Sequence, residues 1–334
     1  MSVLRPTTHP VDISRLWLAL LPVLVVYGAA GVAVVRWMTR RRAARKAAAE
    51  PAAGPESRSP RRRVLRVAVR INLGIAALGI VCGAYSFCEP YRPEVTWTTI
   101  PTARLPAGTK PLRIVQLSDI HSDEGERLEG DLPGIVAGLH PDVITFTGDA
   151  VNQDGGLPHF RRLMQALAAI APTFVVRGNW DVWWYSHLRL FEGTGVQVLD
   201  GRAASIPAGS TRVWLVGAPV DGHDLLWPAL QSVPAGEPTI VLHHYPEVGA
   251  EALRRGADVA LAGDTHGGQV RLPLLGPLVR ISRFGTHYDA GLHRTGGGLL
   301  YVNRGIGMEG GGAPRVRFLC RPEIAVLELA PAAP

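Results

Sequence analysis

The chain has 334 residues, enough for one large domain or two ordinary ones with substantial cores. Its formal net charge is +7, but residues 1–88 carry 14 Lys or Arg against 3 Asp or Glu, a net of +11, which leaves −4 for the rest. The folded part therefore offers no basic track for a nucleic-acid backbone. Cys82, Cys88 and Cys320 are the three cysteines, and they give no disulfide framework.

Two apolar segments near the N-terminus predict membrane helices. Residues 16–35 form an uncharged stretch of about 20 residues, the length that crosses a hydrocarbon core. A signal peptide is the alternative, but the charged region before the stretch is weak and the basic residues after it resemble a stop signal. Residues 67–87 are a shorter second candidate, which requires Arg70 to snorkel. We therefore expect a membrane anchor over residues 1–88.

The basic loop over residues 36–63 lies between these segments and carries ten Lys or Arg and two Glu. By the positive-inside rule such a loop stays cytoplasmic, where it also meets anionic head groups. If both segments cross, the rest of the chain is extracytoplasmic in a multi-pass protein of the bacterial cell membrane. The alternative has one crossing segment, the other in the interface and the folded domain inside.

Residues 89–111 hold five prolines and no helical period, so we expect a linker or an extended lead-in strand. From residue 112 to about 330, strands alternate with helical segments, which predicts βαβ units and a largely parallel sheet. The expected helical segments are 160–170, 182–191 and 248–254. Later strand candidates at 212–216, 298–302, 316–319 and 324–329 indicate a second sheet.

Five strands each end in side chains that bind metals. The groups are Asp119 and His121 after the run from Leu112, Asp149 after 142–147, Asn179 after 173–176, His243 and His244 after 239–242, and Asp264 and His266 after 258–262. In open α/β sheets, ligands bind outside the carboxyl ends of the strands, so these groups are expected to converge.

Imidazole, carboxylate and amide oxygen suit borderline to hard divalent ions, and the absence of cysteine argues against a structural zinc site. Six or seven convergent groups match two ions that share a carboxylate. Ion pairs about 3.5 to 4 Å apart are a standard device for phosphoester cleavage.

The order of these blocks resembles the calcineurin-like metallophosphoesterase superfamily over residues 112–329. The matching motifs are Ser118-Asp119-Ile120-His121, Gly148-Asp149, Gly178-Asn179, His244-Tyr245-Pro246 and Gly263-Asp264-Thr265-His266-Gly267-Gly268-Gln269. Asn303-Arg304-Gly305 and Cys320-Arg321-Pro322-Glu323 look like the membrane-associated bacterial branch of that superfamily.

The resemblance implies a four-layer α/β sandwich, two packed mixed β-sheets flanked by helices, over residues 112–330 and preceded by the two membrane helices. It assigns Asp119, His121 and His266 to a first ion, Asp149 to the bridge, and Asn179 and His244 to a second ion. His244 is preferred over His243 because the family histidine is followed by one residue and then proline, here Pro246.

Two positions depart from the family pattern. Trp180 stands where the family has a histidine that assists the leaving group, and Asp264 stands where it has a second-ion histidine. The Asp264 carboxylate is expected to bind metal, the alternative being that it orients the other ligands. As a harder ligand it favours Mn²⁺, with Mg²⁺, Fe and Zn²⁺ also compatible. Trp180 transfers no proton, so either the leaving group is acidic or Asp181, His187 or His243 supplies the proton.

These observations predict a membrane-anchored two-metal phosphohydrolase that cleaves phosphoester or pyrophosphate bonds through a metal-bridging hydroxide. The anchor indicates a lipid-linked or membrane-proximal substrate. Relatives in the membrane-associated branch hydrolyse UDP-diacylglucosamine, but that substrate is cytoplasmic and conflicts with the favoured topology. The alternative is a degenerate member of the family that binds metal or lipid phosphate without turnover. A membrane-bound nuclease is disfavoured by the net −4 of the folded part.

Overall fold

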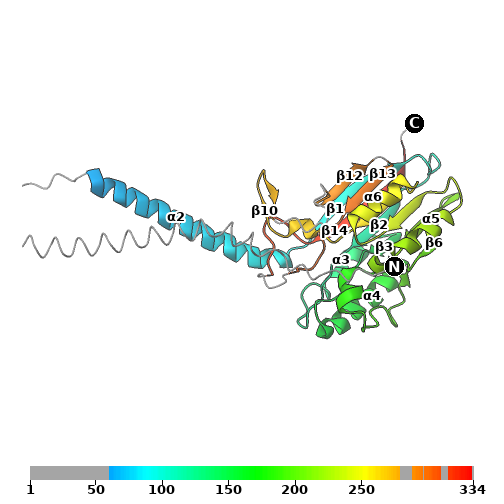
Figure 1. Ribbon diagram of the computed structural model, residues 1–334, viewed down its shortest axis with the longest axis horizontal. Coiled ribbons are helices and arrows are strands. Elements are labelled where there is room, and N and C mark those ends of the chain that lie inside the picture. The colour runs from blue at the N-terminus through cyan, green and yellow to red at the C-terminus, as the bar shows by residue number, and fades with distance from the viewer. Residues whose placement is uncertain (1–59, 279–287, 296, 310–314, 333–334) are drawn as a thin grey trace, which may run out of the picture. The chain divides into compact units, whose positions relative to one another are not determined.

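The computed structural model describes residues 60–278, 288–295, 297–309 and 315–332 (Figure 1). The apolar segment at 16–35 and nearly all of the basic loop lie outside the described residues. The chain divides into two compact units, residues 1–81 with 311–313 and residues 82–310 with 314–334.

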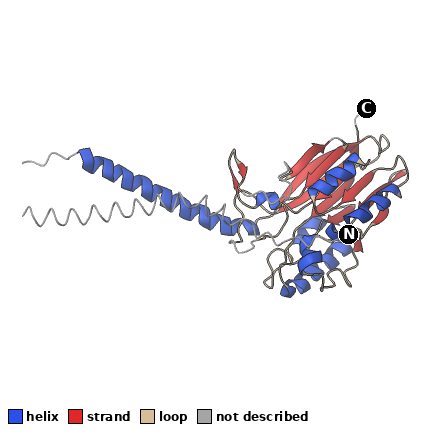
Figure 2. Cartoon of the chain, in the orientation of Figure 1, coloured by secondary structure: helices blue, strands red, loops and turns tan. Residues whose placement is uncertain are grey.

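Helix α2 (Pro60–Cys88) contains the second apolar segment (Figure 2). Within the described part of the chain, one stretch, Val69–Tyr91, is long and apolar enough by length and composition to cross a membrane. Its large apolar side chains are exposed, with Leu73 65% and Ile80 74% accessible. The 3₁₀ turn Glu89–Tyr91 follows the helix directly.

The first sheet has six strands in the order β1-β14-β2-β3-β4-β5. Neighbouring strands are parallel except for the β14–β2 pair. The bounds are β1 (Glu94–Thr102), β14 (Glu323–Pro331), β2 (Leu112–Leu117), β3 (Val143–Phe146), β4 (Thr173–Val175) and β5 (Gln197–Val198). Strand β1 occupies the segment where a linker or lead-in strand is expected, and it pairs with β14 over its whole length.

The second sheet has the order β12-β13-β9-β8-β7-β6. Strands β13, β9, β8 and β7 run parallel, and the edge strands β12 and β6 are antiparallel to their neighbours. The bounds are β12 (Gly291–Thr295), β13 (Gly298–Val302), β9 (Val259–Ala262), β8 (Thr239–Leu242), β7 (Thr211–Gly217) and β6 (Arg202–Ala208). A separate hairpin consists of β10 (Arg271–Leu272) and β11 (Gly276–Pro277).

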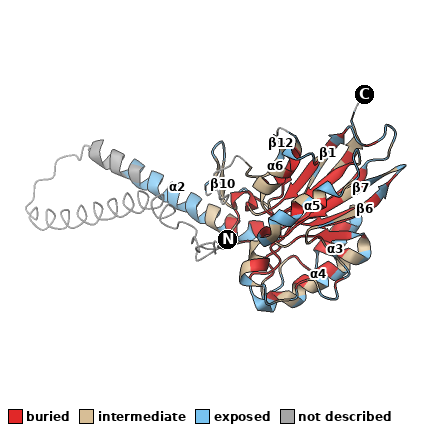
Figure 3. Cartoon of the chain, turned by 45° about the vertical axis from the view of Figure 1, so that its right-hand side comes forward, coloured by how far each residue is buried: buried red, intermediate tan, exposed pale blue. Residues whose placement is uncertain are grey.

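The two sheets pack face to face and helices cover their outer faces, as Figure 3 shows by burial. Side chains alternate along each strand, so Ile114 of β2 and Leu261 of β9 enter the core between the sheets, whereas Val115 and Ala260 face outward. Helices α3 (Leu132–Gly138) and α4 (Leu157–Ile170) cover the first sheet. Helices α5 (Leu226–Gln231) and α6 (Pro246–Arg254) cover the second. The mixed α/β architecture with two flanked sheets is confirmed.

Two predicted elements are wrong. The helix expected over 182–191 is instead a single π-helical turn, Trp180–Trp184, followed by turns. The buried Asp181 side chain accepts hydrogen bonds from neighbouring loops, and Leu190 packs on the first sheet from irregular backbone. The expected strand over 316–319 makes one isolated bridge, Val270 with Phe318, because Leu319 turns the backbone away at φ 52°.

Candidate metal centre

The predicted ligands gather where the carboxyl ends of strands from both sheets meet. Loops after β2, β3 and β4 come from the first sheet, and loops after β8 and β9 come from the second. Hydrogen bonds tie the two sheets together at this edge: the Gln116 side chain donates to Ala262 O at 2.9 Å, and Asn303 donates to Gln116 O at 3.2 Å. The topology therefore brings distant parts of the chain to one place.

Five of the predicted ligands have left-handed backbone conformations, which are rare outside glycine. The φ angles are 50° at Asp119, 47° at His121, 64° at Asp149, 71° at Asp264 and 50° at His266. Each such residue costs on the order of 1 kcal/mol, and the cost persists where the surroundings fix the conformation, commonly at functional sites. The same sharp turn after each strand aims the side chains into one site.

Glycines let the loops approach closely. A Cβ on Gly178 would lie 2.1 Å from Asp149 Oδ1, and one on Gly263 would lie 2.0 Å from Ser118 Oγ and 2.4 Å from Asp119 Oδ2. No larger residue fits at either position without moving a predicted ligand.

The ligand atoms form two overlapping groups that could hold metal ions, namely Asp119, His121 and His266, and Asp119, Asp149 and His244. In the first group, His121 Nε2 lies 3.2 Å from His266 Nε2, which lies 3.4 Å from Asp119 Oδ1. In the second, Asp149 Oδ2 lies 3.3 Å from His244 Nε2. Asp149 Oδ2 is also 3.5 Å from His121 Nε2, so this carboxylate lies between the groups.

Asp264, the residue that departs from the family pattern, lies beside the second group: its Oδ1 is 3.5 Å from His244 Nε2. Asn179 directly precedes Trp180, whose backbone N–H donates to Asp149 Oδ1 at 3.0 Å.

Several buried atoms at this edge lack hydrogen-bond partners within the described part of the chain: Asp119 Oδ2, Asn179 Oδ1 and His244 Nε2. His244 Nδ1 donates to Thr147 O at 2.7 Å, which leaves Nε2 directed at the carboxylates. An unsatisfied buried polar atom costs about 1–3 kcal/mol. Divalent cations would satisfy all three atoms, so the residues fit the ions that the strand-end pattern predicts.

The pKa values of the candidate ligands indicate that metal ions would replace protons on these side chains. Burial raises the pKa of Asp119 and of Asp149 to about 7. Burial also depresses the pKa values of His121 and His266 well below the usual range, so these imidazoles are neutral ligands. For His244, burial acts to lower the pKa, but the neighbouring Asp149 and Asp264 raise it well above the usual value. Metal binding must therefore displace shared protons.

The predicted proton donors belong to neither of the two groups. Asp181 is buried, and its carboxylate accepts hydrogen bonds from the backbone N–H groups of Gly178 (2.8 Å), Asp149 (2.9 Å) and Ala150 (2.8 Å). His243 is buried and accepts a hydrogen bond from Tyr245 N at 3.0 Å, and burial lowers its pKa to about 3. Near neutral pH this imidazole is neutral, and its remaining N–H is too weak an acid to protonate a leaving group.

His187, the third predicted donor, is largely exposed. Its Nε2 pairs with Asp154 at 3.1 Å. This pair lies on the surface and belongs to neither ligand group.

Sequence reasoning missed Glu309. Its Oε2 lies 4.0 Å from His266 Nε2, and the Trp180 side chain hydrogen-bonds to it. Burial, with the charges of Asp264 and Asp119, raises the pKa of Glu309 to about 7. Two hydrogen bonds with Gln269 hold its backbone. A single Glu in a glycine-rich loop carries no sequence signal of this placement.

Arg317 is a second residue that the sequence did not single out. Its guanidinium is fully buried and donates to the carbonyls of Arg304, Gly305, Gly307 and Cys320 at 2.6 to 3.1 Å. Gly307 N in turn donates to Asp119 O at 2.6 Å, and Cys320 Sγ donates to His266 O at 3.3 Å.

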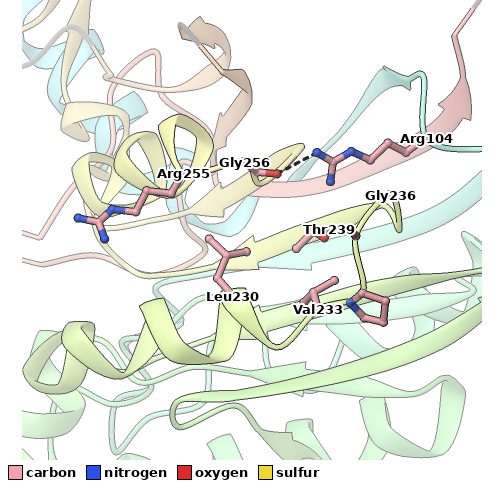
Figure 4. A pocket seen from close by; sticks show the side chains of 9 residues that line it. Arg104, Leu230, Val233, Gly236, Thr239, Arg255 and Gly256 are labelled. Carbon is pink, nitrogen blue, oxygen red and sulfur yellow. Dashed lines mark hydrogen bonds between the residues drawn. The ribbon is translucent and has the colours of Figure 1, made fainter.

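A surface hollow of about 240 Å³ lies at the other end of strand β8 (Figure 4). Its lining includes Thr239, which begins β8, and Arg104, which is bonded to Gly256 O at 3.2 Å and paired with Asp258 at 3.2 Å. Because β8 delivers His244 from its opposite end, this hollow is separate from the metal centre.

Known proteins share this sequence pattern. A sequence model of the calcineurin-like phosphoesterase family matches residues 112–268. The chain is 30% identical over 271 residues to the uncharacterized metallophosphoesterase YkuE of Bacillus subtilis (strain 168), covering 74% of this chain and 89% of that relative. It is 32% identical over 263 residues to the phosphodiesterase YaeI of Escherichia coli (strain K12), covering 74% and 92%. It is 28% identical over 266 residues to a transmembrane protein with metallophosphoesterase domain of Danio rerio, covering 72% and 58%.

Proposed function

From the premise that the chain belongs to the calcineurin-like phosphoesterase family and is a metal-dependent phosphoesterase, we propose that it hydrolyses phosphodiester or pyrophosphate bonds of lipid-linked or membrane-proximal substrates. The observation that carries the proposal is the pair of overlapping buried ligand groups joined through Asp119 and Asp149. At Asp264 a carboxylate that can bind metal replaces the family histidine and lies 3.5 Å from His244 Nε2, which favours hydrolysis over metal binding without turnover.

Asp119, His121 and His266 would hold one ion. Asn179, His244 and Asp264 would hold a second ion, and Asp149, whose carboxylate lies between the two groups, would contribute to both. When bound, two divalent ions supply an acidified water as nucleophile and stabilise the charge that develops on phosphate oxygens. The hard oxygen of Asp264 favours Mn²⁺ over Zn²⁺.

Asp181 is a positioning residue in this account. By holding three backbone N–H groups, it fixes the loops that present Asp149 and Asn179. Trp180 has no proton to transfer, and its ring lies edge-on against His121 with centroids 5.1 Å apart. A substrate whose leaving group is acidic, such as a diester of a phenol or a pyrophosphate, needs no proton donor at this position.

The membrane part of the proposal rests on α2 and on the transmembrane relative from Danio rerio. We place the second span over Val69–Tyr91 and the first over residues 16–35, with the basic loop cytoplasmic and the phosphoesterase domain outside. Phosphodiesters of membrane lipids would then be presented at the surface from which the domain extends.

The proposal is tested by hydrolysis of bis(p-nitrophenyl) phosphate and p-nitrophenyl phosphate by the purified full chain, scanned across Mn²⁺, Mg²⁺, Zn²⁺ and Fe²⁺. We expect turnover that depends on the metal, is highest with Mn²⁺, and falls at least 100-fold in Asp149→Ala. The matched control is Asp224→Ala, whose carboxylate is on the surface. Bound metal without turnover of any diester, monoester or pyrophosphate would favour the non-hydrolytic alternative.

A further inference from the structure

The β10–β11 hairpin exposes leucines at its tip. The loop between the strands is Pro273-Leu274-Leu275, with Leu274 fully exposed and Leu275 74% exposed; Leu278 beyond β11 is 52% exposed. Polar residues or glycine normally occupy such turns. Leu274 also has φ 67°, a left-handed conformation that is costly for a leucine. A leucine therefore occupies a position where glycine or asparagine would adopt the same backbone conformation at a lower free-energy cost.

A second exposed leucine lies next to the hairpin in the same strained conformation. Leu319 is 45% exposed and has φ 52°. Its neighbour Phe318 bridges to Val270 at the base of the hairpin, and Arg271 N donates to Phe318 O at 2.9 Å. The segment 318–320 and the hairpin therefore form one continuous surface.

This surface continues onto the end of the candidate membrane span. The rings of Tyr85 and Phe318 meet edge-on at 5.6 Å, and Glu89 accepts a hydrogen bond from Cys320 N at 2.8 Å. Figures 1 and 3 both show the hairpin beside the last turns of α2. Phe87 and Tyr91 on those turns are 61% and 57% exposed. All of these residues belong to the unit of residues 82–310 with 314–334.

We propose that the apolar rim formed by Phe87, Tyr91, Leu274, Leu275, Leu278 and Leu319 lies in the lipid interface and holds the metal centre against the bilayer. Aromatic side chains at the end of a span favour the head-group level. Arg92, which directly follows Tyr91, is exposed and suits lipid phosphates. Apolar side chains beside a span enter the boundary between head groups and acyl chains.

The position of the hairpin in the chain connects the rim with catalysis. Leu274 comes eight positions after His266, so their Cα atoms would be at most about 29 Å apart even if that stretch were fully extended. Resting on the proposed function, the inference specifies that the substrate reaches the ligands from the lipid surface rather than from bulk water.

The test is a nitroxide label at Leu274→Cys in the full chain, placed in phosphatidylglycerol–phosphatidylcholine nanodiscs. The background carries Cys82→Ser and Cys88→Ser and retains the buried Cys320. The matched control is Leu225→Cys, a leucine of similar exposure to Leu278 that lies in the 3₁₀ turn Val220–Leu225 over the second sheet. The measurement is the collision rate of each label with oxygen and with a water-soluble nickel chelate.

We expect the ratio of the oxygen collision rate to the nickel-chelate collision rate to be severalfold higher at Leu274→Cys than at Leu225→Cys. We expect a similar increase over the control at Leu275→Cys. Equal ratios at the hairpin and control positions would place the hairpin in water and overturn the inference. Low collision rates with both reagents would indicate contact with a second protein copy and would also overturn it. The assay needs no turnover, so its failure is distinct from absence of the diesterase activity.

Discussion

Asp149 shows how single residues build this site. Its backbone turns in the left-handed region, Asp181 accepts its N–H, and its Oδ2 lies within 3.5 Å of both His121 and His244. The ligand atoms are thereby held together before any ion arrives, and close carboxylates and imidazoles of this kind repel or share protons unless a cation separates them.

The shared protons predict how metal affinity depends on pH. Asp119 and Asp149, with pKa values of about 7, hold protons below that pH, and bound metal must displace them. Affinity for Mn²⁺ should therefore fall as pH falls below 7, by about tenfold per pH unit for each proton displaced. Above 7 the dependence should become shallower, because only the proton on His244, whose pKa is raised well above its usual value, remains to be displaced. Calorimetric titrations at pH 6, 7 and 8 measure this, and an affinity that is flat across the range would contradict it.

Asp264 predicts the choice of metal. The change Asp264→His replaces a hard oxygen ligand with imidazole, which suits Zn²⁺ better, so the ratio of Zn²⁺ to Mn²⁺ affinity should rise by about tenfold or more. Asp264→Asn is the control, because it removes the charge but keeps an oxygen. Competition titrations give the ratios, and an unchanged ratio in the histidine variant would remove Asp264 from the metal's ligands.

At the level of elements, sequence prediction succeeded where one pattern decided the structure. Strands 239–242 and 298–302 match β8 and β13, and helix 160–170 lies within α4, because each has a regular apolar period. Residues 182–191 share a helical pattern but fold as turns, since buried side chains can pack on a sheet from irregular backbone. Such tertiary contacts are invisible to a local pattern.

The same distinction applies to the site. The side chains of Asp119, His121, Asp149, His244, Asp264 and His266 follow strands, so their convergence could be predicted from the sequence. Glu309 and Arg317 reach the site from the segments after β13, where only tertiary packing brings them in. The unusual burial of Arg317 could not be inferred from a sequence in which arginine is ordinarily exposed.

Arg317 therefore gives a prediction about stability and metal affinity. Arg317→Leu should leave several buried carbonyls of the 304–307 loop unpaired and lower the free energy of unfolding by about 3 kcal/mol or more. Because Gly307 bonds to Asp119, metal affinity should fall as well. Denaturant unfolding and metal titration measure the two effects. The control is Arg189→Leu, at an exposed surface pair, and an equal small effect in both variants would contradict the assigned role.

Charged and apolar residues are distributed unevenly between the first 88 residues and the rest of the chain. The first 88 residues carry +11 and the rest −4, which suits an anchor with a basic loop joined to an acidic domain. The charge counts and the lengths of the apolar segments predict this division. They do not fix the side of the membrane on which the domain lies, because that side depends on how many segments cross.

Reporter fusions at the C-terminus of the full chain test the topology. Alkaline phosphatase should be active there and green fluorescent protein dark, because two crossings return the chain to the outer side. Fluorescence without phosphatase activity would instead indicate a cytoplasmic domain and a single crossing.

Hydrolysis by this site, as proposed, requires one chain to bind two ions that share Asp149. The most direct measurement is the number of Mn²⁺ ions per chain after reconstitution, together with the electron paramagnetic resonance spectrum of the loaded protein. We expect two ions per chain and the multiline spectrum of a coupled pair. The multiline spectrum should be lost in Asp149→Ala. One ion per chain with an isolated six-line spectrum, in a protein that still hydrolyses diesters, would contradict it.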